Sequence, residues 1–586
     1  MSSTGAAKGT APGPIVPADT PAAADTFHAD DPPARPAAEP GHHVPASAPL
    51  DVADRRRLGR LRRWGTVGAL LMAVGSTSSY GAATPIPNPL DGLRVIGLLS
   101  RLGPAALACS YAGIGLLVLC WFLIGRLSRP GRERRLSRTQ LTHTLAMWSV
   151  PLLITPPIFS RDSYSYLAVG QMMANGLDPY AQGPYDALGD GDPLAHQVDA
   201  RWQHTTSPYG PAFLLIARGV VAITGDSVVA GVLVQRLVEL LGVAMIVWAL
   251  PRLARRCGID PVAALWLGAL NPVLLFHLVA GAHNEALMLG FMLAGLVVAL
   301  GRTADGPQDP PWLHERPWLR VVAGSALITV GVGVKATAAM ALAFLVVALA
   351  RRAGGRWADL WRWALVVGAT TLAVFAVLTL WAGVGLGWIS ALNTPGSVRS
   401  FLSVSTTLGA GAGQIGLLLG LGDHSSAAID VMQPVGTALG ALLALVVLWR
   451  CWRPGRSGRI LEPIQGLGLA LGAFVLLGPV IQPWYLLWAA LPLAASTGLS
   501  GYRRATIWLT TVFAVIIMPN GATIPVFTIF QAVAVGAVVV GGVLLLLRRG
   551  DGLPAGAPAS PLARFRRPPR RSVAGEAAAS PYSDAS

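Results

Sequence analysis

Residues 104–125 read PAALACSYAGIGLLVLCWFLIG, an apolar run that contains no charged residue. A helix of about 20 apolar residues is long enough to cross the hydrocarbon core of a bilayer. Six arginines follow between positions 126 and 138, and short arginine-rich loops are typical of the cytoplasmic side of a membrane. This stretch therefore predicts a membrane helix whose C-terminal end faces the cytoplasm.

The same alternation of apolar runs and arginine-rich loops continues along the chain. Only 13% of the 586 residues are charged and 53% are apolar, whereas soluble proteins average about 25% charged residues. The net charge of +16 is explained by the loop arginines, so we expect no nucleic-acid partner. We predict an all-α polytopic membrane protein with about 14 transmembrane helices. The predicted spans lie near 64–83, 104–125, 140–159, 227–250, 261–281, 284–301, 319–334, 336–350, 361–382, 429–449, 463–481, 485–499, 505–519 and 523–547.

Arginine clusters set the predicted orientation, with both termini in the cytoplasm and the protein in the cell (plasma) membrane. Two short apolar runs would place these clusters outside if they crossed, so we predict that 209–225 is interfacial and that 411–422 is interfacial or re-entrant. The transmembrane domain is expected to cover 55–550, with an external loop at 160–226. The flanking tails, 1–54 and 551–586, are poor in bulky apolar residues and are expected to be disordered.

The external loop opens with the sequence SRDSYSY at 160–166, directly after a predicted span. A carboxylate at Asp162 would stand at the rim of the bilayer, where it can meet both a lipid headgroup and water. We therefore take Asp162 as the candidate general base. The alternative is that Asp162 only caps the helix that follows, because aspartate is a preferred N-cap residue.

Polar residues also gather at three predicted external turns. His283, Asn284 and Glu285 stand between two apolar spans, where they could bind a ligand or simply cap the next helix through Asn284. Lys335 interrupts a long apolar stretch; it could hold a phosphate or only snorkel at a helix end.

The third turn carries Gln482, Trp484 and Tyr485, which could stack on a sugar or belong to the interfacial aromatic belt. In the span 227–250, Arg236 and Glu239 share a helix face, and we predict that they neutralise each other. No metal site is expected, because His283 and its neighbours lack the spacing of metal motifs.

Five short motifs occur in order along this topology: RDSYSY, NGLDPY, SPYGP, LNP followed by GAHNE, and VKAT. Together they resemble the actinobacterial polyprenol-phosphomannose-dependent alpha-1,6-mannosyltransferases of the GT-C superfamily. The resemblance covers roughly 60–550. It implies a GT-C-type fold and an inverting transfer of mannose from polyprenyl-phosphate-mannose to a lipomannan-type glycolipid mannoside on the external face, without a cofactor.

The resemblance also implies roles for individual residues. Asp162 matches the catalytic carboxylate of the first external loop, and Lys335 and Arg161 would stabilise the leaving phosphate. Sugar or acceptor contacts are expected from Tyr164, Tyr166, His283, Asn284, Glu285, Gln482, Trp484 and Tyr485. A transporter or flippase for a lipid-linked saccharide is the alternative, but it would favour internal repeats and polar residues at the bilayer centre, whereas the polar motifs here gather on one face.

Overall fold

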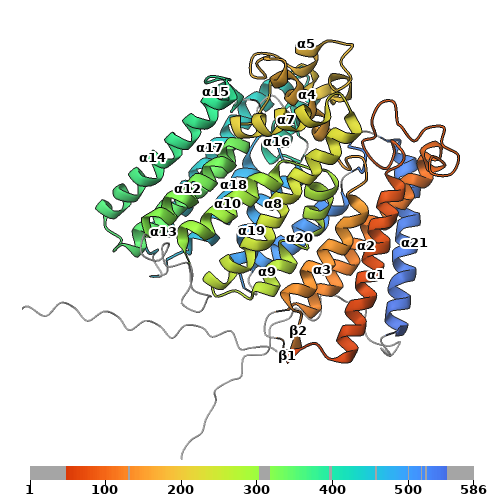
Figure 1. The fold of residues 1–586 in the computed structure, drawn as a ribbon, viewed down its shortest axis with the longest axis horizontal. Coiled ribbons are helices and arrows are strands. Elements are labelled where there is room, and N and C mark those ends of the chain that lie inside the picture. The colour runs from red at the N-terminus through yellow and green to blue at the C-terminus, as the bar shows by residue number, and fades with distance from the viewer. Residues whose placement is uncertain are drawn as a thin grey trace, which may run out of the picture. The chain divides into compact units, whose positions relative to one another are not determined.

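The computed structural model describes residues 48–550, except 130–131, 133, 302–316, 393, 395–398, 401, 456–457, 459, 499–500, 517 and 522–523. The described residues belong to one unit, which begins at Pro45 (Figure 1). The predicted disordered tails lie outside the described residues except at 48–54. There the first helix already begins at Val52, before the predicted boundary at 55.

The described chain is almost entirely helical, as predicted. A single pair of two-residue parallel strands joins β1 (Ala48–Pro49) to β2 (Arg134–Arg135). The α-helices are α1 (Val52–Gly75), α2 (Gly103–Leu127), α3 (Arg138–Ser149), α4 (Asp162–Ala174), α5 (Pro184–Leu188), α6 (Ala200–Gln203), α7 (Pro211–Thr224), α8 (Val228–Arg256), α9 (Pro261–Leu267), α10 (Glu285–Leu300), α12 (Pro317–Val334), α13 (Met340–Arg352), α14 (Trp357–Ala382), α15 (Trp388–Ala391), α16 (Val404–Leu418), α17 (Ser425–Trp452), α18 (Pro463–Leu477), α19 (Leu486–Ser496), α20 (Gly501–Val515) and α21 (Val526–Gly550). Short 3-10 helices are η1 (Leu99–Arg101), η2 (Val150–Leu152), η3 (Ala195–Gln197), η5 (Ala336–Ala339) and η7 (Pro483–Tyr485), and η4 (Leu274–Ala280) is a π-helix.

Every predicted span overlaps a helix or a broken pair of helices, although some end beyond it, as 64–83 does beyond α1, and not all of these helices are long. Within the described residues, six are long and apolar enough to cross a membrane: α2, α8, α12, α14, α17 and α21. A seventh crossing is possible if η4 and α10, which are bent by 110° at the break between them, form one span. These helices indicate a membrane-embedded protein, while the count of fourteen crossings stays a prediction.

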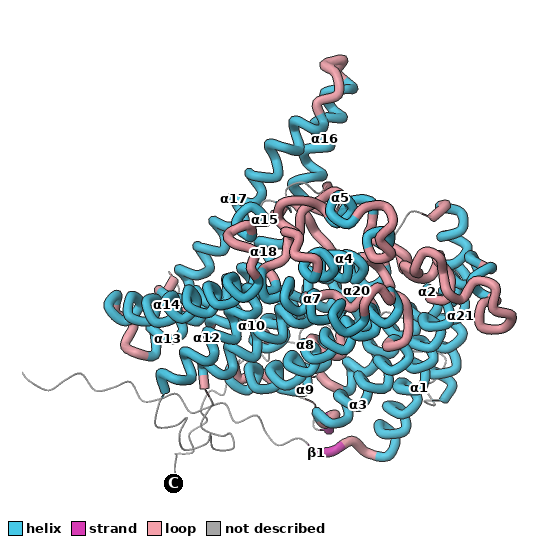
Figure 2. The backbone as a smooth tube through the Cα atoms, turned by 45° about the horizontal axis from the view of Figure 1, so that its top comes forward, coloured by secondary structure: helices cyan, strands magenta, loops and turns pink. Residues whose placement is uncertain are grey.

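The predicted interfacial helix is α7, which has 14 residues. At 1.5 Å per residue it extends about 21 Å, which is shorter than the hydrocarbon core of about 30 Å. The predicted re-entrant run 411–422 falls mostly in α16, which packs against α17 (Figure 2).

Close helix packing organises the region around the candidate site. Helix α8 packs against α10, which in turn packs against α12. Gly242 of α8 has no room for a Cβ, because the backbone of Ala286 lies against it. Small residues at such crossings let two backbones approach closely. The start of α10, which carries Glu285, is thereby fixed against α8.

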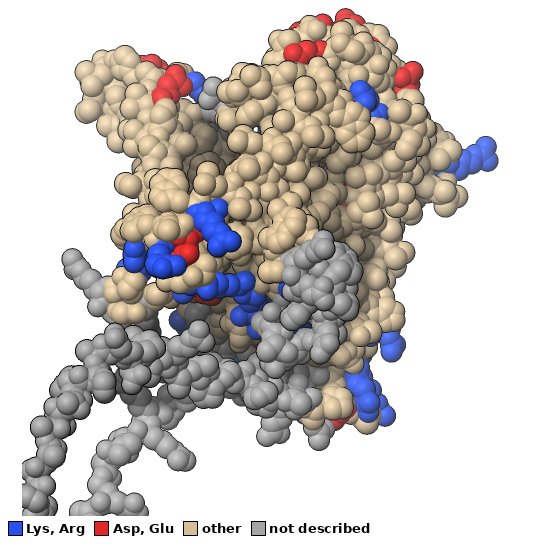
Figure 3. Space-filling model, turned by 60° about the vertical axis from the view of Figure 1, so that its left-hand side comes forward, with Lys and Arg blue, Asp and Glu red and all other residues tan. Residues whose placement is uncertain are grey.

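Arginines gather around the C-terminal end of α10, opposite the end that carries Glu285. Arg256 and Arg352 both donate hydrogen bonds to the carbonyl oxygen of Leu300, the last residue of α10. Arg351 donates to the carbonyls of Cys451 and Leu461. The carbonyls of Leu300 and Cys451 are among those that a helix leaves unpaired at its C-terminal end. In Figure 3 the visible acidic side chains lie mainly along the upper edge, and most of the basic ones lie lower.

Candidate active site

Four breaks between helices meet at the end of the bundle opposite these arginines. They are the start of α4, the turn at 281–284 between η4 and α10, the residue between α12 and η5, and the segment between α18 and α19. At two of them the backbone of a non-glycine residue is left-handed, with φ of 76° at Phe159 and 51° at Ala282. Such conformations cost energy and are concentrated at functional sites.

Asp162 is the first residue of α4 and points its carboxylate at His283. Arg161 occupies the N-cap position without a side-chain cap bond, so Asp162 is not the cap that the alternative reading requires. Asp162 Oδ2 lies 3.4 Å from His283 Nδ1, and 19% of the Asp162 side chain is exposed. Burial raises the pKa of this carboxyl, but the contacts with His283 and Ser160 and the charge of Lys335 outweigh burial and lower it.

His283 is fully buried between the two acidic residues of the cluster. Its Nδ1 lies 3.4 Å from Asp162 Oδ2 and 4.0 Å from Glu285 Oε2. The imidazole stacks on the Trp484 indole with ring centroids 3.8 Å apart. Trp484 therefore holds the histidine ring in the orientation in which it faces Asp162.

Glu285 and Lys335 form a buried ion pair, since their side chains are only 1% and 16% exposed. The Lys335 ammonium also donates to the Tyr485 hydroxyl at 3.4 Å and lies 4.5 Å from the centre of the Tyr485 ring. Burial alone would lower the pKa of Lys335, but Glu285 and Tyr485 raise it above its ordinary value. The ammonium turns inward to a carboxylate, which is not the geometry of snorkelling.

Asn284 completes the turn and is also buried. Its backbone N–H lies 3.4 Å from the Tyr166 hydroxyl, which accepts the hydrogen bond. Asn284 holds the N-cap position of α10 but makes no side-chain cap bond. Within the described residues, both amide atoms of Asn284, Nε2 of His283 and Oε2 of Glu285 are buried without a hydrogen-bond partner. Buried polar atoms are normally satisfied, so this cluster has hydrogen-bonding capacity to offer a ligand.

Two predicted site residues, Arg161 and Tyr164, make their side-chain contacts outside this cluster. Arg161 donates to the carbonyls of Thr84 and Gln197 at 3.0 and 2.9 Å, and its guanidinium lies over the Tyr164 ring. The Tyr164 hydroxyl donates to the carbonyl of Ala83. Arg161 and Tyr164 therefore brace the 83–84 segment. Gln482 stands at the N-cap of η7, and its side chain makes no cap bond.

The predicted Arg236–Glu239 pair is wrong. Arg236 donates to the backbone carbonyls of Leu153, Val279 and Ala280, while Glu239 accepts from the Gln235 amide and the Leu287 N–H. Helical spacing places the two side chains on one face, but each finds backbone partners at the helix breaks instead. These unpaired backbone groups are not visible in a sequence pattern.

Sequence reasoning also missed four residues that contact the cluster. Ser160 accepts the backbone N–H of Asp162. His277 lies 5.8 Å from His283, ring to ring, and Lys335 lies 5.5 Å from the Trp488 ring. Glu239 contacts the first turn of α10. Only Trp488 had a usable signal, because it follows Tyr485 by three residues and so shares its helix face.

No metal site is formed by the described residues, among which no three His, Cys, Asp or Glu side chains lie close enough to hold an ion. The site instead offers one accessible carboxylate, one paired lysine and several unsatisfied polar atoms inside a set of long apolar helices. This combination is typical of a functional site in a membrane-embedded protein, because ionisable residues among apolar helices are costly unless they serve a site.

Comparisons with known proteins identify the family. Residues 62–351 match the family model described as alpha-(1->6)-mannopyranosyltransferase, N-terminal domain. Residues 405–546 match the model of the MptB C-terminal domain. The chain belongs to the alpha-(1->6)-mannopyranosyltransferase family, which confirms the resemblance drawn from the five motifs.

Relatives align over most of the chain. It is 43% identical to a Mycolicibacterium smegmatis protein named probable alpha-(1->6)-mannopyranosyltransferase, over 85% of this chain and 90% of the relative. It is 40% identical to a Mycobacterium tuberculosis alpha-(1->6)-mannopyranosyltransferase, over 85% and 89%. The identity to alpha-(1->6)-mannopyranosyltransferase B of Corynebacterium glutamicum is 37%, over 85% and 83%. No solved structure matches the chain.

Proposed function

We propose that this protein is an inverting alpha-1,6-mannosyltransferase that moves mannose from polyprenyl-phosphate-mannose to a mannose-bearing glycolipid of the lipomannan type. The names of its relatives support the linkage and the sugar. The apolar helices support a lipid-linked donor, because such a donor is delivered from the bilayer.

Asp162 acts as the general base in this proposal. The acceptor hydroxyl oxygen attacks the anomeric carbon, its proton passes to the Asp162 carboxylate, and the bond from the anomeric carbon to the phosphate oxygen breaks. One displacement inverts a beta-linked donor to an alpha product. The Asp162 carboxylate is ionised near neutral pH, as a general base must be; its lowered pKa makes it a weaker base than a free aspartate, so its position beside the acceptor hydroxyl has to supply the catalysis.

Lys335 stabilises the departing phosphate in this scheme. Its ammonium has three hydrogens, and Glu285 and Tyr485 are the partners of two of them. The third hydrogen is available to a phosphate oxygen, and a charge-assisted bond of this kind strengthens as negative charge develops on the leaving oxygen. Arg161 is bound to two backbone carbonyls, so we assign it a positioning role.

We assign the reaction to the external face of the membrane. Support comes from the separation of charges along the same helices, because Glu285 begins α10 and the arginines bound to Leu300 lie at its other end. Arginine-rich ends are typical of the cytoplasmic side. A transporter is not favoured, because the chain's family is one of transferases.

The observation that carries the proposal is that Asp162 is the partly exposed acid of a cluster whose other acid, Glu285, is neutralised by Lys335. Only one of the two carboxylates is thus left to accept a proton from a substrate. We therefore expect the two acids to behave differently when each is replaced by its amide.

The test uses purified protein, polyprenyl-phosphate-mannose and a synthetic mannoside acceptor. Asp162→Asn should reduce the transfer rate by at least about 100-fold, the lower bound for the loss of a general base. Asp226→Asn is the matched control, because Asp226 is an exposed acid between α7 and α8, and it should transfer at the wild-type rate. An Asp162→Asn variant that is folded and retains near-normal transfer would refute the assignment.

A further inference from the structure

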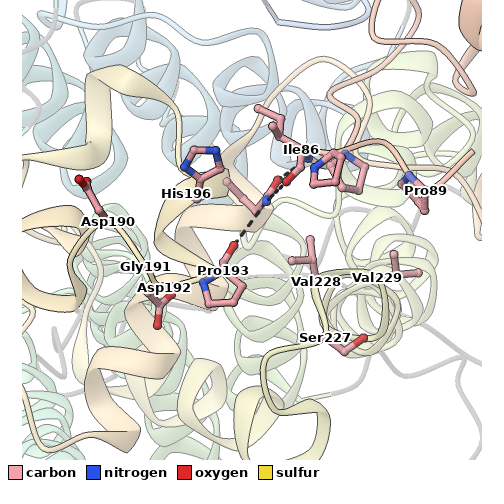
Figure 4. A pocket seen from close by; sticks show the side chains of 13 residues that line it. Ile86, Pro89, Asp190, Gly191, Asp192, Pro193, His196, Ser227, Val228 and Val229 are labelled. Carbon is pink, nitrogen blue, oxygen red and sulfur yellow. Dashed lines mark hydrogen bonds between the residues drawn. The ribbon is translucent and has the colours of Figure 1, made fainter. Parts of the chain in front are cut away.

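A cavity outside the candidate active site has no role in the scheme above. It has a volume of about 520 Å³, within the range of small-molecule sites. Figure 4 shows its walls: the proline-rich segment 85–89 on one side, the segment 190–197 on another, and the first residues of α8 on the third. All of these residues belong to the predicted external side of the chain.

Hydrogen bonds hold the wall of this cavity in a fixed shape. Gln197 is 3% exposed; its side chain accepts from the N–H of Ile86 and donates to the carbonyl of Ile86, both at 2.8 Å. Pro85, Pro87 and Pro89 further restrict the facing segment. Asp192 binds the N–H groups of Leu194 and Ala195. The cavity is therefore preformed, which lowers the entropy lost when a ligand binds.

The cavity is joined to the catalytic residue through Arg161. The Arg161 guanidinium donates to the carbonyl of Gln197, which lines the cavity, and to that of Thr84, which precedes the lining residue Pro85. Asp162 directly follows Arg161 in the chain. The same side chain thus braces the cavity wall and the start of α4, so the cavity wall is tied directly to the segment that carries Asp162.

The residues that line the cavity indicate which chemical class of ligand it can bind. None of the thirteen described residues that line the cavity is a lysine or an arginine, which argues against a phosphate group. The carboxylates of Asp190 and Asp192 and the imidazole of His196 can bond to hydroxyl groups, while prolines, Val228 and Val229 offer apolar surface. Hydroxyl-rich rings with apolar faces combine both properties, whereas a polyprenyl chain has no hydroxyl group to bond to Asp190, Asp192 or His196.

We propose that this cavity binds the non-reacting mannosyl units of the acceptor saccharide, next to the unit whose hydroxyl is activated by Asp162. The proposal rests on the proposed mannosyl transfer and extends it, because the cavity would make the enzyme's affinity depend on the length of the acceptor. A single-sugar acceptor reaches Asp162 without entering the cavity. A longer acceptor gains binding energy from it.

Gly191→Trp fills the cavity with little disturbance. Gly191 lines the cavity, has open space around the position of a Cβ and does not use a left-handed backbone. Gly219→Trp is the matched control, since Gly219 lies in α7 and is equally open. Val229→Trp fills the cavity from α8, where Val229 is 48% exposed, and serves if the loop variant is unstable.

The assay compares a monomannoside with an alpha-1,6-linked tetramannoside as acceptors. Filling the cavity should lower kcat/KM for the tetramannoside by about tenfold, equivalent to the loss of one or two hydrogen bonds. The monomannoside and donor constants should stay at wild-type values, as should all constants of Gly219→Trp. Equal losses for both acceptors, an increased donor KM, or no loss at all would overturn the proposal.

Direct binding separates this proposal from the proposed reaction. Saturation-transfer NMR titration with free alpha-1,6-mannotetraose and no donor should give the same Kd for wild-type protein and Asp162→Asn, and a Kd about tenfold higher for Gly191→Trp. If wild-type protein binds the tetraose but transfers no mannose, the proposed reaction is refuted and the proposal for the cavity is retained. If wild-type protein transfers mannose and Gly191→Trp binds the tetraose equally well, the cavity proposal alone fails.

Discussion

Lys335→Met tests whether the Lys335–Glu285 pair holds the site together. Methionine keeps the length and apolar stem of lysine but leaves the Glu285 carboxylate, which is 1% exposed, without its cation. Removing one partner of a buried pair leaves an uncompensated charge in a medium that solvates it poorly. We therefore expect the single variant to be less stable than wild-type protein, although its shape is conserved.

The expected loss is about 3 kcal/mol, the lower end of the range for broken buried pairs. The lower end applies because Lys335 keeps 16% of its side chain exposed, so water can reach the vacated position. Contacts of the ammonium with the rings of Tyr485 and Trp488 are lost as well. The double variant Lys335→Met with Glu285→Gln removes both charges and should lie within about 1–2 kcal/mol of wild-type protein.

The assay is thermal inactivation in detergent, followed by loss of the folded monomer peak in size-exclusion chromatography. The double variant should survive heating better than either single variant, while both variants that lack Lys335 should transfer mannose slowly. If Lys335→Met is as stable as wild-type protein, or if the double variant is no better than the single ones, the pair does not stabilise the site and the reasoning from burial is wrong.

Two further predictions follow from the packing and charge of the site. The pKa of Asp162 is lowered in the folded protein, so the stability contributed by its ionised form is complete above the value of about 3.9 for free aspartate and is lost as the pH falls through the lower folded-state value. We expect kcat/KM to fall in acid over the same pH window. The variant His283→Gln removes a contact that lowers this pKa and should move the acid limb of the pH–rate profile to higher pH, whereas an unmoved limb would exclude Asp162 as its origin. Gly242→Ala should destabilise the protein by about 1–3 kcal/mol and slow transfer, because it forces α10 away from α8; Gly368→Ala in α14, which meets nothing, is the control, and equal melting behaviour of the two variants would contradict the packing argument.

The ends of the helices could be predicted from the sequence because charge and hydropathy change there. Lys335 was predicted to stand between two apolar runs, and it lies between α12 and η5. His283 and Glu285 were predicted at a turn, and they flank the break before α10. A polar residue in an apolar chain is expensive unless it reaches a partner or water, so its position alone marks the break.

The partners of these residues could not be predicted, because they come from segments far apart in the chain. Nothing in the sequence states that Glu285 meets Lys335 or that Trp484 stacks on His283. Arg161 stands next to Asp162 in the sequence, yet its side chain turns to the carbonyls of Thr84 and Gln197. Neighbouring positions at the start of a helix point in different directions, and tertiary contacts decide which direction leads to the site.

Charged residues inside the helices and charged residues at the helix breaks have different roles in this fold. Arg236, in the N-terminal third of α8, is 1% exposed and donates to the carbonyls of Leu153, Val279 and Ala280, which lie at two helix breaks. Glu239, one turn further on, binds the Leu287 N–H in the first turn of α10. A helix break in apolar surroundings exposes backbone groups that water cannot satisfy, so buried side chains from α8 must bond to them. The charges at the breaks are thereby left to face one another and the substrate.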